Sequence, residues 1–181
     1  DMAGGRRGAD LLVAALKARG VEVVFSLSGN QIMPVYDALL GSGIRIVHTH
    51  RDPVRSVPST VSLSTLMRTS RANGVDANLL GQMVVMGYGA MLRKVIEERG
   101  GGVIPPGQIT DVHFQDLMKD PVGTVERAYD TLGLPFTTGF ADAIRDYLAR
   151  KPRDRFGKHR YRAEDYGLTT QGIREEFRFY T

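Results

Sequence analysis

The sequence predicts a small three-layer α/β fold, in which a short parallel sheet has helices on both faces. Three short apolar stretches, residues 21–25, 44–49 and 109–114, are typical of buried strands. Segments with helical periodicity lie between them, and the connections in the first part of the chain are short. Helices and strands that alternate in this way form right-handed crossovers, which place neighbouring strands parallel.

The first forty-nine residues alternate helix, strand, helix, strand. Residues 10–18 carry an apolar stripe at helical spacing, and Gly20 ends that helix. The turn at 26–31 is rich in small residues, and we expect Asn30 in it to cap the helix over 32–40. This segment therefore supplies one strand–helix–strand crossover before the chain reaches residue 50.

Residues 46–53 form an apolar strand that ends in Arg51, followed by Asp52 as a helix N-cap and Pro53 at the first helical position. An arginine at this place is well suited to an anion, because its guanidinium and the first backbone N–H groups of the helix both attract negative charge. Pro58 removes an internal hydrogen bond, so we expect it to kink or shorten that helix.

The second half of the chain is mainly helical. Residues 79–98 form the longest helical pattern, which we interpret as a core helix, with Met83, Met86 and Met91 packed inside. Capping residues and glycines predict further helices over 121–132, from 137 or 138 to 149, and from 169 or 170 to 180. A stretch dense in arginine and lysine, residues 151–161, precedes the last of these.

Composition favours a single α/β domain over residues 1–181, since 42% hydrophobic residues suffice for one core. The net charge of +4 comes mostly from arginine, which suits phosphate or sulfate ligands. Nucleic acid is not expected as a partner, because the sequence has no aromatic-interleaved basic patch and no zinc-finger or zipper spacing.

The absence of cysteine excludes disulfides and thiolate chemistry. The four histidines do not stand at ligand spacing, so no metal site is expected. We interpret His48 and His113 as structural strand residues, and no catalytic residue is assigned. Apolar runs are short compared with a bilayer span, so we expect a cytoplasmic protein with no membrane partner.

Residues 8–49 resemble the N-terminal, pyrimidine-binding domain of thiamine diphosphate enzymes of the acetolactate synthase type. The resemblance rests on residues 8–17, 20–25 and 27–39. It places Asp52 where that family has the glutamate that activates the cofactor, and no Gly-Asp-Gly…Asn segment follows to hold magnesium and the diphosphate. Thiamine diphosphate is therefore not the expected cofactor.

Residues from about 46 to 181 resemble a bacterial sulfotransferase family that uses 3′-phosphoadenosine-5′-phosphosulfate (PAPS). The segments 50–59, 111–123 and 151–168 carry this resemblance. It implies a truncated P-loop-NTPase/sulfotransferase-like fold over the segment 50–181 and a small-molecule nucleotide donor. It also implies that Arg51 and Ser59 bind the 3′-phosphate of PAPS or of its product PAP (3′-phosphoadenosine 5′-phosphate). The family's late basic loop closes over the same phosphate, and its matching positions here are Arg155, Gly157, Lys158, His159, Arg160 and Tyr161. Of these, the resemblance favours Lys158 and Arg160 as phosphate partners.

Parts of a complete sulfotransferase site are missing from the sequence. The turn at 26–31 stands where the family has its 5′-phosphosulfate loop, but it contains no lysine or arginine, and no acceptor-binding region or base precedes Arg51. The sulfuryl acceptor is therefore unknown, and the chain can retain binding of the nucleotide's 3′ end without catalysing sulfuryl transfer.

Three hypotheses stay open. The first is a sulfotransferase-like protein that retains the 3′-phosphate half of the site and is either active or inactive. The second is a thiamine diphosphate-binding fragment of an acetolactate synthase-like enzyme. The third is a non-enzymatic chimera, natural or engineered, joined near residues 48–52. Exposed sheet edges would favour a homo-oligomer in each case.

Overall fold

The computed structural model describes residues 7–27, 33–105, 107–151 and 160–180. The chain forms two compact units. The first combines Asp1–His50 with Glu97–Lys151, and the second combines Arg51–Ile96 with Pro152–Thr181. The first boundary falls between His50 and Arg51, inside the segment where the two resemblances meet. That both units act as one domain stays a prediction.

The first unit is built on a three-stranded sheet in the order β1-β2-β3. Strands β1 (Val23–Leu27), β2 (Arg45–His50) and β3 (Ile109–His113) are all parallel to their neighbours. Each begins and ends within two residues of its predicted range. The predicted parallel α/β architecture is therefore confirmed.

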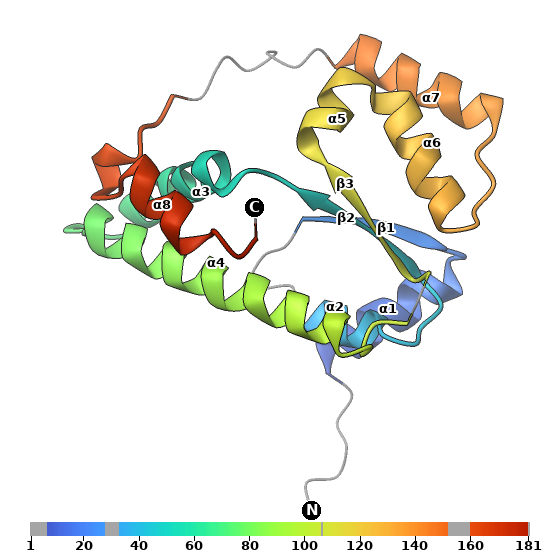
Figure 1. Ribbon diagram of the computed structural model, residues 1–181, viewed down its shortest axis with the longest axis horizontal. Coiled ribbons are helices and arrows are strands. Elements are labelled where there is room, and N and C mark those ends of the chain that lie inside the picture. The colour runs from blue at the N-terminus through green and yellow to red at the C-terminus, as the bar shows by residue number, and fades with distance from the viewer. Residues whose placement is uncertain (1–6, 28–32, 106, 152–159, 181) are drawn as a thin grey trace, which may run out of the picture. The chain divides into compact units, whose positions relative to one another are not determined.

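Helices cover both faces of this sheet (Figure 1). Helices α1 (Gly8–Ala18) and α2 (Met33–Leu39) lie on one face, and α6 (Pro121–Thr131) lies on the other, with α5 (Phe114–Lys119) and α7 (Thr138–Arg150) beside it. Thr137 caps α7, as expected, by accepting from the backbone N–H of Phe140. Helix α5 was not predicted, because the strand pattern was read as continuing to residue 114.

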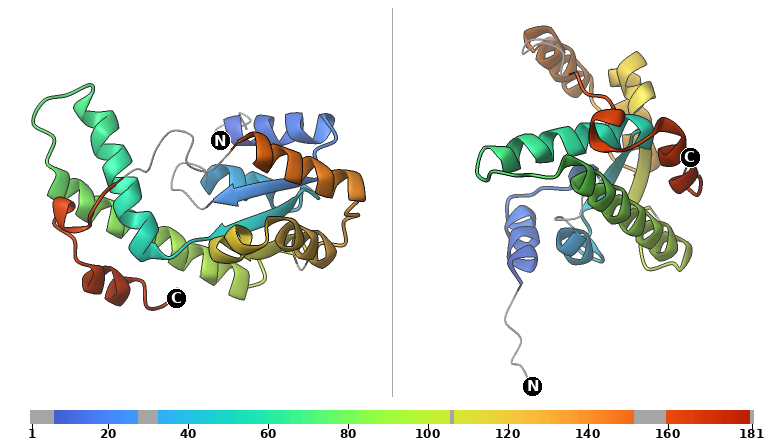
Figure 2. Two further views of the ribbon diagram at one scale, coloured as in Figure 1. Left: turned by 90° about the horizontal axis from the view of Figure 1, so that it is seen from above. Right: turned by 90° about the vertical axis from the view of Figure 1, so that its left-hand side faces the viewer.

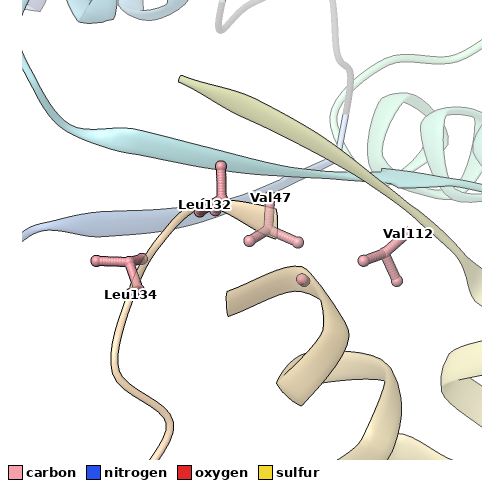
Figure 3. Close-up of a cluster of buried hydrophobic side chains, with 5 residues drawn as sticks. Val47, Val112, Leu132 and Leu134 are labelled. Carbon is pink, nitrogen blue, oxygen red and sulfur yellow. The ribbon is translucent and has the colours of Figure 1, made fainter. Parts of the chain in front are cut away.

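The core of the first unit has two halves, one on each face of the sheet. Val47 and Val112 pack against α6 and the residues that follow it, as Figure 3 shows for one cluster. The buried residues of this cluster are Val47, Val112, Ala128, Leu132 and Leu134. Ile46 points to the opposite face and packs with residues of α1 and α2. This alternation follows from the two-residue period of a strand, and it makes β2 the most buried element.

A buried amide fixes the point where β3 joins the sheet. Gln108 Nε2 donates to the carbonyl oxygens of Leu39 at 2.6 Å and Ile44 at 2.9 Å. The carbonyl oxygen of Gln108 in turn accepts from the backbone N–H of Ile46 at 2.7 Å. One residue therefore joins the end of α2, the start of β2 and the start of β3.

The second unit contains α3 (Pro53–Thr69), most of α4 (Ala77–Gly100), a short 3₁₀ turn (Glu164–Tyr166) and α8 (Thr170–Glu176). The chain passes from β2 directly into α3 (Figure 2). Pro58 does not shorten α3, which continues for 17 residues. Burial of Pro58 with Val57 and Val61 offsets the hydrogen bond that the proline removes.

The interpretation of α4 as a core helix is wrong for much of its length. Met91 is buried, but the side chains of Met83 and Met86 are 53% and 72% exposed. Contrary to the expectation from short apolar runs, α4 is also long and apolar enough to span a membrane by length and composition alone. Core helices of soluble proteins pass the same test, so no location follows.

Close backbone packing joins α4 to the C-terminal segment within the second unit. A Cβ added at Gly81 would overlap the carbonyl oxygen of Tyr166 and lie 3.4 Å from Leu168 Cγ. Further along α4, the guanidinium of Arg93 lies over the Phe179 ring at 3.8 Å and contacts Glu176. Helix α4 is thus one of the helices against which the C-terminal segment of the second unit packs, and α3 is the other.

Replacing Gln108 with alanine should lower the free energy of unfolding by about 2–3 kcal/mol, because the buried carbonyl oxygens of Leu39 and Ile44 each lose a hydrogen bond from the amide. Urea denaturation followed by circular dichroism measures this loss. Gln171→Ala is the control, since the Gln171 amide donates only to an exposed carboxylate on its own helix. An equal loss in both variants would contradict the role given to Gln108.

Gly81→Ala should destabilise the second unit by about 1–3 kcal/mol, since the added methyl group overlaps backbone that has little room to move. Gly139→Ala in α7 meets no atom within 4 Å and should instead stabilise by about 0.5–1 kcal/mol. Thermal unfolding of both variants tests the pair. A stabilising Gly81→Ala would show that α4 and the Tyr166 turn do not pack this closely.

Candidate functional site

Arg51 stands where β2 ends and α3 begins, as the sequence predicts. Asp52 caps α3 by accepting from the backbone N–H of Val54 at 2.8 Å, and Pro53 occupies the first helical position. The next two N–H groups, of Arg55 and Ser56, both donate to the carbonyl oxygen of Asp52 at 2.9 Å. The first-turn N–H groups therefore already have partners, and an anion here must be held mainly by side chains.

Ser59 lies on α3, about 9 Å along the helix axis from Pro53. Ser56 and Ser59 are three residues apart and share one side of the helix. The Ser56 hydroxyl donates to the Asp52 carbonyl oxygen at 3.2 Å. Arg51 and Ser59 are both half-buried, so neither is a freely solvated surface residue.

The end of the basic stretch lies against the first turn of α3. The Tyr161 hydroxyl donates to the carbonyl oxygen of Arg55 at 3.3 Å, and the exposed Arg160 directly precedes Tyr161. Arg155, Gly157 and Lys158 lie outside the described residues, as does His159. Of the predicted loop residues that the structure describes, Tyr161 contacts the first turn of the helix that Arg51 precedes, and Arg160 is its neighbour in the chain.

The turn after β1 is described only in part, because residues 28–32, including Asn30, fall outside the described ranges. The hydroxyls of Ser26 and Tyr36 form a hydrogen bond with each other. Ser26 therefore has a hydrogen-bond partner within the fold.

A second polar cluster lies in the first unit, at the carboxyl ends of β2 and β3. His48 pairs with Asp111 in the strand register, and His50 pairs with His113. His50 Nε2 donates to Asp111 Oδ1 at 2.6 Å, and His48 Nδ1 lies 3.8 Å from the same oxygen. Arg99, near the end of α4, donates to both carboxylate oxygens of Asp111 at 2.6 Å.

This environment shifts two pKa values. Burial lowers the pKa of His48 to about 4, helped by the neighbouring His50 and Arg99 and opposed by Asp111, so its imidazole is neutral at pH 7. Burial would by itself raise the pKa of Asp111, but hydrogen bonds from Arg99 and His50 outweigh it and hold that pKa well below its usual range. The cluster therefore combines a neutral imidazole with an ionised carboxylate.

The expectation that no histidines stand at ligand spacing is corrected by this geometry. His48 and His50 are two residues apart in a strand, so their side chains lie on the same face. Together with Asp111 they bring three potential ligand atoms within 4.8 Å of one another. The His-x-His pattern in a strand could have identified the pair, but Asp111 joins it only through the strand register.

Two family profiles match the chain, and together they confirm the two resemblances. The sulfotransferase family matches residues 43–138, just over half of the chain. The N-terminal domain of thiamine pyrophosphate enzymes, which binds that cofactor, matches residues 6–54. The two matches overlap at residues 43–54, which include β2 and the start of α3.

Curated relatives divide in the same way. The chain is 29% identical over 128 residues, 70% of its length, to omega-hydroxy-beta-dihydromenaquinone-9 sulfotransferase Stf3 of Mycobacterium bovis. It is 52% identical over 97 residues, 42% of its length, to a catabolic acetolactate synthase of Raoultella terrigena. The matched part makes up 31% of the first protein and 17% of the second, so the chain spans no more than about a third of these relatives.

Solved structures agree on the fold. Sulfotransferase STF9 from Mycobacterium avium superimposes with a TM-score of 0.69 at 24% identity, covering 83% of this chain and 38% of that one. Sulfotransferase STF1 from Mycobacterium tuberculosis gives a TM-score of 0.65, with 81% and 37% covered. The fold is thus a truncated form of the sulfotransferase fold. Because a family profile matches more than half of its residues, the chain belongs to the sulfotransferase family.

Proposed function

We propose that this chain binds the sulfuryl donor PAPS or its product PAP through the 3′-phosphate, with Arg51 and Ser59 as the main contacts. The observation that supports this most is the return of Tyr161 to the first turn of α3, the helix that Arg51 precedes. The second unit therefore contains all three of Arg51, Ser59 and Arg160.

These residue types suit a phosphate. A guanidinium gives two parallel hydrogen bonds to phosphate oxygens, and a hydroxyl adds a neutral donor. The Asp52 carboxylate would repel the anion, but its charge is partly offset because it accepts from the N–H of Val54 at the positive end of α3. Affinity should therefore depend strongly on Arg51. Arg155, Gly157 and Lys158 are proposed as further contacts on the basis of the resemblance alone.

Sulfuryl transfer is the kind of reaction to which the family points. Transfer also requires a grip on the 5′-phosphosulfate and a base for the acceptor. The turn at 26–31 has no basic residue, and Ser26 bonds to Tyr36. We therefore propose nucleotide binding as the retained function and assign no acceptor and no catalytic residue. Cytoplasmic location and self-association stay predictions.

Thiamine diphosphate binding is the second candidate, favoured by the match over residues 6–54 and by 52% identity to an acetolactate synthase. Asp52 stands at the position of that family's activating glutamate, but here its carboxylate caps α3. No segment of the sequence resembles the family's magnesium-binding motif. We infer that thiamine diphosphate is not a ligand of this chain.

The Arg51→Ala variant should bind PAP at least about tenfold more weakly than the original chain, because a charge-assisted hydrogen bond contributes roughly 1.5–3 kcal/mol. Ser59→Ala should lose less, about two- to tenfold, since a hydroxyl is a neutral donor. Isothermal titration calorimetry measures both. Arg68→Ala, at the other end of α3, is the matched control and should bind PAP normally.

Adenosine 5′-phosphate, which lacks the 3′-phosphate, separates this proposal from general nucleotide binding. It should bind much more weakly than PAP to the original chain and equally weakly to Arg51→Ala. Equal affinity for both nucleotides would refute the 3′-phosphate assignment. Binding of thiamine diphosphate with magnesium, but not of PAP, would support the second candidate instead.

A further inference from the structure

We propose that His48, His50 and Asp111 form a binding site for one divalent transition-metal ion such as Zn²⁺. The three side chains come from β2 and β3 in the first unit, and their ligand atoms lie within 4.8 Å of one another. Its three ligands include none of the residues proposed to contact the phosphate. The metal proposal therefore does not depend on the proposed function.

The donor set decides which metal fits. Two imidazole nitrogens and one carboxylate oxygen are the ligands that Zn²⁺, Co²⁺ and Ni²⁺ accept, whereas Mg²⁺ and Ca²⁺ prefer oxygen ligands alone. Three protein ligands leave a fourth tetrahedral position for water. The sequence contains no cysteine that could compete for such a metal.

The metal would take the place of a proton. His50 Nε2 donates to Asp111 Oδ1 at 2.6 Å, and His48 Nδ1 lies 3.8 Å from that oxygen. For the ion to bind, the proton on His50 Nε2 must leave that nitrogen, so that His50 Nε2 and His48 Nδ1 both present lone pairs.

Burial and second contacts hold these ligands in place. The His48 side chain is 2% exposed and the His50 side chain 13%, so both rings have few alternative orientations. Asp111 is 37% exposed, which gives an ion access from solvent. Arg99 holds both carboxylate oxygens and so orients Asp111. Its positive charge opposes the metal, so the affinity should be lower than at a closed structural zinc site.

His113 supplies a matched control. It is the strand neighbour of His50, with ring centroids 5.5 Å apart, but its side chain is exposed and it is not part of the three-residue group. A His113→Gln variant removes a nearby imidazole of the same type. The experiment can therefore distinguish a defined site from general attraction of metal to histidine.

The test is titration of the full chain, free of any polyhistidine tag, with Zn²⁺ by calorimetry and with Co²⁺ by visible absorption. We expect one equivalent to bind, with the Co²⁺ bands between about 500 and 650 nm that are typical of four-coordinate sites. His50→Gln and Asp111→Asn should each weaken binding at least about tenfold, and His113→Gln should leave it within about twofold. Circular dichroism without metal checks that each variant is folded.

Either of two results would overturn the proposal. The first is a dissociation constant weaker than about 1 mM for Zn²⁺ and Co²⁺ with the original chain, which needs no variant to be folded. The second is a loss with His113→Gln equal to that with His50→Gln, which would show that the metal does not select the three proposed ligands.

Discussion

The hydrogen-bonded register of β2 is the constraint on which both candidate sites depend. β2 is the central strand, paired on both sides, and its residues Ile46, Val47 and His48 are almost completely buried. A slip of one residue would exchange the faces of Val47 and His48, which would place an imidazole in the apolar cluster against α6. The same register sets His48 opposite Asp111, and the end of β2 at His50 leaves Arg51 as the residue that leads into α3.

Much of this arrangement could be predicted because it is encoded locally. The three strands are apolar runs, and the sequence Asp52-Pro53 is a helix start that the structure reproduces with a hydrogen bond from Val54. The exposure of Met83 and Met86 could not be predicted, since helical periodicity shows that a stripe exists but not what covers it. Asp111 joined the histidines only through pairing between strands some sixty residues apart. The sequence also predicts that the backbone N–H groups at the start of α3 bind an anion, but in the structure they donate to the side chain and carbonyl oxygen of Asp52.

Two families share this strand, and physical chemistry explains how one backbone can satisfy both. The two matches overlap at residues 43–54. In this chain those residues form a buried parallel strand, with Ile46 and Val47 in the core, followed by a polar turn into α3. The resemblances place Asp52 at the position of the thiamine enzymes' glutamate and Arg51 at the position of the sulfotransferases' phosphate-binding arginine. The segment in which the two matches overlap therefore contains Arg51, the main residue of the proposed phosphate site.

The most direct test of this account is a titration of the ¹⁵N-labelled chain with PAP, followed by NMR spectra of the assigned backbone amides. If the 3′-phosphate binds where β2 passes into α3, the largest shifts should fall on residues 51–59 and on Arg160 and Tyr161. Shifts confined to residues 26–31, or spread evenly over the basic surface, would contradict the account.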